Sequence, residues 1–99
     1  MSALVSTAPG ASKAGEVEDG ELVRRIRRGD DHAFELIYQR YHRRITAYIH
    51  GMVHDHARAE DVAQDVFVSA LRRMRETDRP IAFKPWIYEI GRASCRERV

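Results

Sequence analysis

One candidate interaction surface is formed by two carboxylates, an amide and a valine. Asp61, Gln64, Asp65 and Val68 recur every three or four residues, which places them on one face of a helix. A small apolar side chain within a ring of hydrogen-bond acceptors is typical of a surface that contacts another protein. An ordinary solvent-exposed helix face is the alternative interpretation.

A second group of polar residues, His50, His54, Asp55 and His56, has types that can bind a metal ion. His50 and His54 have the i, i+4 spacing of a zinc pair on a helix. The helix is expected to end near Val53, however, and no glutamate is placed as in HExxH. We therefore expect a polar inter-helix loop and no metal. The sequence has no nucleophile–base pair, GxGxxG motif or P-loop, so we expect neither catalysis nor a cofactor.

The composition limits the class of protein that these residues can belong to. The 99 residues are 43% hydrophobic and 32% charged, which is enough for one small domain. No apolar run is long enough to span a membrane, and the N-terminus lacks the pattern of a secretory signal. The single cysteine, Cys95, excludes a disulfide framework and suits an intracellular setting. With few Gly and Pro after residue 30, the composition favours an all-α fold.

The first 18 residues are rich in Ala, Ser, Gly, Thr and Pro and are expected to form a disordered leader. The domain is expected to span residues 19–89. Its first helix should cover residues 20–28, with Asp19 as the N-cap and Gly29 as the stop. We interpret the arginine cluster of this helix as a solvated face that offsets the helix dipole, with a nucleic-acid contact as the alternative.

Three further helices complete a predicted bundle of about four. The second should cover residues 32–53, capped by Asp30 or Asp31, and the third residues 59–75. The predicted buried half of the third helix consists of Ala59, Val62, Ala63, Val66, Phe67, Ala70, Leu71 and Met74. Residues 77–82 should form a loop, with Phe83 and Lys84 still on its side, and the fourth helix should begin at Pro85.

The last ten residues, IGRASCRERV, show no hydrophobic periodicity and resemble one reading frame of a sequencing adapter. We interpret residues 90–99 as a non-native tail, with a genuine basic terminus as the alternative. They hold three arginines and one glutamate, so residues 1–89 have 14 basic and 14 acidic side chains. The basic isoelectric point therefore arises from the tail and does not by itself indicate nucleic-acid binding.

Two segments carry a family resemblance. AEDVAQDVF (59–67), followed by FKPWIYEI (83–90), resembles region 2 of bacterial RNA polymerase sigma factors of the extracytoplasmic-function (ECF) group. The upstream RGDDHAFELIYQRYHRRITAYI (28–49) is similar to the first conserved block of that family. The combination is specific, because an Asp-x-x-Gln-acid helix is followed by a Phe-x-x-Trp entry to the next helix.

The resemblance implies a compact helical domain that acts in transcription initiation in the cytoplasm. Its Asp-x-x-Gln-acid helix would dock on the clamp helices of the largest subunit of core RNA polymerase. Asp61, Gln64 and Asp65 occupy the matching positions, and Val68 lies on the same predicted face. The loop and the fourth helix would bind the promoter −10 element and help to separate its strands, holding the single-stranded non-template strand.

Basic and aromatic residues near that loop are the expected DNA contacts. Phosphates attract Lys and Arg, and an unstacked base needs a pocket or an aromatic face. The expected set is Arg72, Arg73, Arg79, Phe83, Lys84, Trp86 and Tyr88. For Trp86 and Tyr88 the alternative is a role as core anchors of the fourth helix.

The sequence departs from the family after Gly91-Arg92, where the family continues its fourth helix with an Asn and further basic residues. The linker and the domain that reads the −35 element do not follow, so the chain resembles a truncated sigma factor. An anti-sigma factor is a further implied partner, and no membrane contact or small-molecule substrate is expected. The alternative function is a small helical protein-interaction module without a DNA role.

Overall fold

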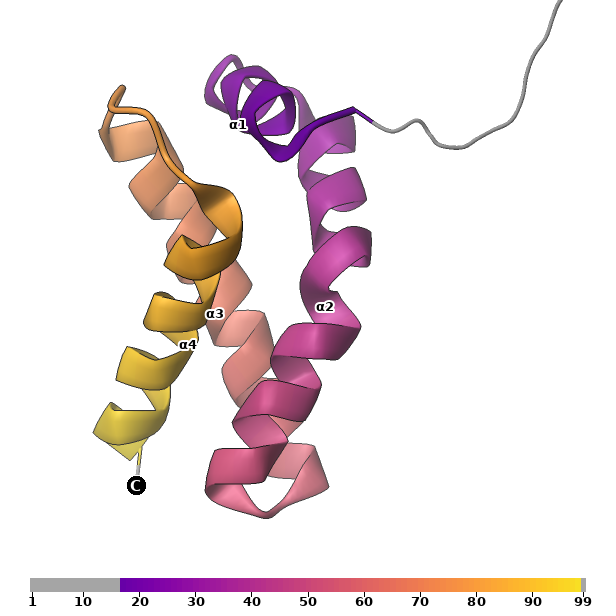
Figure 1. Cartoon of the computed structure of the whole chain (residues 1–99), viewed down its shortest axis with the longest axis vertical. Coiled ribbons are helices and arrows are strands. Elements are labelled where there is room, and N and C mark those ends of the chain that lie inside the picture. The colour runs from indigo at the N-terminus through magenta and orange to yellow at the C-terminus, as the bar shows by residue number, and fades with distance from the viewer. Residues whose placement is uncertain (1–16, 99) are drawn as a thin grey trace, which may run out of the picture.

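The chain folds into a bundle of four helices. The structure is a computed structural model that describes residues 17–98, and within this range it has no strand. The helices are α1 (Asp19–Arg27), α2 (Asp31–Val53), α3 (His56–Glu76) and α4 (Phe83–Arg98). The two long helices α2 and α3 are joined by a tight turn, α1 crosses one end of the bundle, and α4 packs against α3 and α2 (Figure 1). The predicted all-α fold is confirmed.

The core is built from apolar stripes of all four helices. The largest fully buried side chains are Leu22, Ile26, Ile37, Ile45, Ile49, Val62, Val66, Phe67, Met74 and Ile87. Full burial of one such side chain contributes about 1.5–3 kcal/mol to folding. All the residues predicted for the buried half of α3 are buried except Leu71, which is half-buried. The helical register predicted for α3 is therefore confirmed.

The predicted N-cap of α1 is wrong. Glu18, not Asp19, is the N-cap residue, and its side chain makes no capping hydrogen bond. The Asp19 carboxylate instead accepts hydrogen bonds from Arg40 and Tyr41 of α2. The Asp19 carboxylate is thus engaged with α2, in part through a charge-assisted hydrogen bond to a guanidinium, and does not cap α1.

The predicted leader, residues 1–18, lies outside the described residues except at its last two positions. Val17 packs against the core, and Glu18 occupies the N-cap position of α1. The folded domain therefore includes two residues that the composition assigned to the leader.

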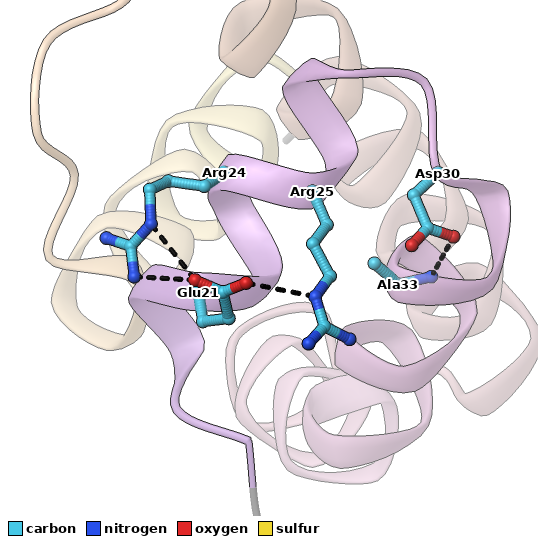
Figure 2. A network of polar contacts seen from close by, with 5 residues as sticks. All are labelled: Glu21, Arg24, Arg25, Asp30 and Ala33. Carbon is cyan, nitrogen blue, oxygen red and sulfur yellow. Dashed lines mark hydrogen bonds and ion pairs between the residues drawn. The ribbon is translucent and has the colours of Figure 1, made fainter.

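Side-chain caps set the starts of α2 and α3. Asp30 accepts a hydrogen bond from the Ala33 N–H at 3.1 Å, as predicted for the second helix (Figure 2). Asp55 accepts one from the Arg58 N–H at 3.1 Å, so α3 begins at His56, three residues earlier than predicted. An Asp before a helical run satisfies one of the N–H groups that the first turn leaves unpaired.

The predicted start of α4 is also wrong. Residues 77–82 form a loop as predicted, but Phe83 is already helical, so Phe83 and Lys84 belong to the helix. Pro85 lies in the first turn, where its missing N–H needs no partner. The Trp86 N–H donates to the Ala82 carbonyl at 3.2 Å and closes that turn.

α4 continues through the segment interpreted as a non-native tail. Ile90 and Cys95 are 4% and 2% exposed, and together with Ile87 they lie at helical spacing on the side that faces the core. Two side chains of this segment are therefore buried, although they are five residues apart in the sequence. Burial also raises the pKa of the Cys95 thiol. The non-native origin of residues 90–99 stays a prediction.

The arginines of α1 are largely engaged within the protein. Glu21 accepts hydrogen bonds from Arg24 at 2.7 Å and from Arg25 at 3.0 Å (Figure 2). These two hydrogen bonds lower the pKa of the Glu21 carboxyl. The Arg27 side chain reaches the backbone of α3 and of the following loop. Within residues 17–98, no helix combines the length and hydropathy that a membrane span requires.

Candidate functional site

The outward face of α3 carries the four residues predicted to contact a protein partner. Asp61, Gln64, Asp65 and Val68 are all exposed, on the side of the helix away from its buried residues. Val68 is 61% exposed and is the only large hydrophobic side chain in residues 17–98 that is exposed to this extent. The face therefore combines one exposed apolar side chain with two carboxylates and an amide, as the sequence pattern predicted.

A groove lies between the end of α3, the α3–α4 loop and the start of α4. Its volume is about 440 Å³. It is lined by Arg73, Thr77, Arg79, Pro80, Ile81, Ala82, Pro85, Trp86 and Glu89. The lining therefore combines two arginines, one aromatic ring and one carboxylate, which together can contact phosphates, stack on a base and accept a hydrogen bond.

The structure brings three of the seven predicted DNA contacts together in this groove, namely Arg73, Arg79 and Trp86. Arg72 and Lys84 are exposed nearby on α3 and α4 but do not line it. The groove is also lined by Pro80, Ile81 and Ala82, which belong to the loop that the resemblance assigned to the −10 element. Glu89 was not predicted, and its position three residues after Trp86 is the signal that could have indicated it.

Phe83 does not have the placement that a DNA contact requires. Its side chain is 2% exposed and packs against the ring of Tyr41, with 5.2 Å between centroids. On its other side it contacts Trp86, with centroids 5.9 Å apart. Phe83 therefore anchors the start of α4 and supports the half-buried Trp86 ring from inside. Its expected role as a contact residue is corrected accordingly.

Tyr88 also contributes to packing. It is half-buried, and its ring meets that of Tyr48 edge-on at 4.9 Å between centroids and 77° between planes. The contact fastens α4 to α2, and Tyr88 itself does not line the groove although Trp86 and Glu89 on either side of it do. The alternative role considered for Tyr88, an anchor of the fourth helix, is therefore part of what this side chain does.

A chain of contacts links the first residue of α1 to the groove. Asp19 accepts hydrogen bonds from Tyr41 and, at 2.7 Å, from Arg40, while the Tyr41 ring packs on Phe83 behind Trp86. Burial, followed by the hydrogen bond to Asp19 and its negative charge, raises the pKa of Tyr41 to about 12. The neutral phenol is thus favoured by the fold.

We expect the stability of the domain to fall between about pH 10 and pH 12 as Tyr41 ionises. The folded chain has a Tyr41 pKa of about 12 against an ordinary value of 10.0, so it holds this proton more tightly than the unfolded chain. The stabilisation is complete below pH 10 and is lost as the pH rises through 12. Urea unfolding across this range should show a steeper loss for the wild type than for Tyr41→Phe. The same pH dependence of the free energy of unfolding in both proteins would contradict the raised pKa of Tyr41.

The histidines near the α2–α3 turn do not form a metal site in the part of the chain that the structure describes. No group of three or more His, Cys, Asp or Glu side chains in residues 17–98 is arranged to hold an ion. His54 adopts a left-handed conformation, φ 58°, and its N–H caps α2 through the His50 carbonyl at 2.8 Å. His56 lies 3.4 Å from Glu60 at the start of α3.

Comparison with known proteins connects this arrangement to a family. The model of the Sigma-70 region 2 family matches residues 37–99. The RNA polymerase sigma-H factor of Pseudomonas aeruginosa is 40% identical over 74 residues, covering 75% of this chain and 38% of the relative. The ECF RNA polymerase sigma-E factor of Escherichia coli K12 is 31% identical over 76 residues, covering 77% and 39%. The chain thus spans about two fifths of the length of these relatives.

A solved structure shares the fold. The NMR structure of an engineered region 2 of sigmaE in complex with GTAAAA is 28% identical to this chain, with a TM-score of 0.76. The match covers 83% of this chain and 85% of the solved one.

Proposed function

Because the chain belongs to the Sigma-70 region 2 family, we propose that it binds core RNA polymerase and the single-stranded promoter −10 element during transcription initiation. The observation that carries the proposal is the likeness to the solved region 2 of sigmaE, whose complex contains GTAAAA. The family match favours this function over a helical interaction module without a DNA role. The proposed function is non-catalytic and cytoplasmic, and an anti-sigma factor is a proposed further partner.

The groove is the proposed DNA site. Arg73 and Arg79 line it and can neutralise phosphates, with Arg72 and Lys84 exposed beside it. Trp86 offers a ring on which an unpaired base can stack, while Glu89 can accept a hydrogen bond from a base amino group. Holding an unstacked base offsets the few kcal/mol that its removal from the duplex costs.

The outward face of α3 is the proposed polymerase site. Asp61, Gln64 and Asp65 are acceptors that suit a basic partner surface, and Val68 supplies an apolar contact beside them. None of these four residues lines the groove, whose lining on α3 begins at Arg73 near the end of the helix. The proposed polymerase and DNA sites therefore share no residue.

We expect the 99-residue chain to bind labelled GTAAAA more tightly than its complement, TTTTAC, in fluorescence anisotropy. Trp86→Ala should weaken binding by roughly 5- to 150-fold, because one base–aromatic stack contributes about 1–3 kcal/mol. Trp86→Phe keeps an aromatic face and should retain most of the affinity.

Circular dichroism of each variant provides the control for folding, since Trp86 is half-buried against the core. Binding should weaken as salt increases, because arginine–phosphate contacts release counterions. Equal affinity for the two strands, or a folded Trp86→Ala variant with wild-type affinity, would count against the proposed DNA site.

A further inference from the structure

Arg27 connects the end of α1 to two backbone carbonyls that are 47 and 52 residues away in the sequence. Its Nε donates a hydrogen bond to the Met74 carbonyl at 2.8 Å, and its Nη2 donates one to the Arg79 carbonyl at 2.7 Å. One planar group at the end of α1 therefore holds both the last turn of α3 and the middle of the α3–α4 loop. The side chain is half-buried, whereas that of its neighbour Arg28 is exposed.

The Met74 carbonyl that Arg27 binds has no hydrogen-bond partner within its own helix, because Met74 is in the last turn of α3. Thr77, the C-cap residue, is extended at φ −137° and ψ 151°, so the helix does not end in the left-handed turn that would cap it. The Arg27 guanidinium takes that role and adds positive charge at the negative end of the helix.

The same guanidinium restrains the loop that lines the groove. The Arg79 carbonyl accepts a hydrogen bond from Arg27, and the Arg79 N–H donates one to the Thr77 hydroxyl oxygen at 3.2 Å. Both backbone polar groups of this loop residue are therefore hydrogen-bonded. Arg79 and Thr77 both line the groove. A loop that is fixed before binding loses less conformational entropy when DNA occupies it.

We propose that Arg27 is a positioning residue that fixes the α3–α4 loop in the conformation that binds single-stranded DNA. This proposal rests on the proposed function. The rigid fork of a guanidinium spans both carbonyls, whereas a lysine ammonium has the charge but not that geometry. Arg27 acts through two protein carbonyls, so most of its effect should depend on the fork, with a smaller share from its positive charge at the end of α3.

The test compares three variants of the 99-residue chain. Arg27→Lys keeps the charge and removes the fork, Arg27→Ala removes both, and Arg28→Ala removes an adjacent exposed charge without touching the contact. The first readout is amide hydrogen exchange at Arg79, whose N–H is hydrogen-bonded within the loop, and at Trp86, whose N–H is hydrogen-bonded in the first turn of α4. The second is the Kd for labelled GTAAAA.

We expect both Arg27 variants to exchange faster at these two amides, by roughly 10-fold for Arg27→Ala, because the bonds of one charged donor group are lost. The Kd for GTAAAA should rise by a similar factor, with Arg27→Lys between Arg27→Ala and the wild type. Arg28→Ala should leave exchange unchanged and alter the Kd by less than either Arg27 variant.

The exchange measurement needs no DNA, so it separates this proposal from the proposed function. Unchanged exchange in Arg27→Lys and Arg27→Ala would overturn the positioning role, whatever the DNA affinity. Faster exchange without a loss of affinity beyond that of Arg28→Ala would overturn the link to binding. Absence of GTAAAA binding by the wild type would overturn the proposed function while leaving the restraint on the loop established by exchange.

Discussion

The Phe67→Ala variant is expected to be largely unfolded at room temperature. Phe67 is 2% exposed in the centre of the bundle, and its ring meets that of Tyr38 edge-on at 4.9 Å between centroids. Removing a buried phenyl group costs about 3–5 kcal/mol, since the neighbours fill the cavity only in part. A domain of this size rarely has more than about 3–5 kcal/mol of stability to lose.

Circular dichroism and urea unfolding measure this effect directly. The matched control is Val68→Ala, one residue further along α3, where the side chain is 61% exposed. Its free energy of unfolding should stay within about 0.5 kcal/mol of the wild type, because alanine favours helix and no cavity forms. A Phe67→Ala variant that melts like the wild type would contradict the packing of α3 described above.

The second large effect is expected at the proposed polymerase site. The triple variant Asp61→Ala, Gln64→Ala, Asp65→Ala should lose at least roughly 100-fold of its affinity for core RNA polymerase. Each charge-assisted hydrogen bond that is buried on docking contributes about 1.5–3 kcal/mol. The positions are exposed and alanine is a good helix former, so the far-ultraviolet circular dichroism should be preserved.

A second triple variant with the same chemical losses provides the control. Glu35→Ala, Gln39→Ala and Glu76→Ala also remove two carboxylates and one amide from exposed helical positions. This variant should bind core polymerase with wild-type affinity, as measured by surface-immobilised binding or co-elution. Equal losses in both variants would indicate a general effect of net charge, and retention of affinity in the first would remove the assignment of this face.

The sequence predicted the long helices well because their positions repeat a local pattern. In α2 and α3 the apolar residues recur at the helical period over many turns, and burial follows that period directly. For the same reason the sequence could place four residues of α3 on one exposed face, namely Asp61, Gln64, Asp65 and Val68. Such predictions need only the spacing of residues along one helix.

Long-range contacts could not be predicted in this way. Arg27 and the carbonyls that it binds are 47 and 52 residues apart, and backbone acceptors leave no trace in residue types. From the sequence alone, the Asp19 carboxylate could either cap the first helix or bind distant side chains. It binds Arg40 and Tyr41 because α1 packs on α2. For the same reason the sequence does not show whether the Phe83 side chain points into the core, where the structure places it, or into solvent.

Trp86, which lines the groove beside Arg73 and Arg79, is the only tryptophan among the 99 residues. The indole emission of the chain therefore originates from one place, and that place is the proposed nucleotide site. Its half-buried ring is close enough to solvent for its emission to respond when water is displaced from the groove. Unlabelled protein consequently contains an intrinsic optical probe at this position, and a quencher such as iodide would distinguish an open groove from an occupied one.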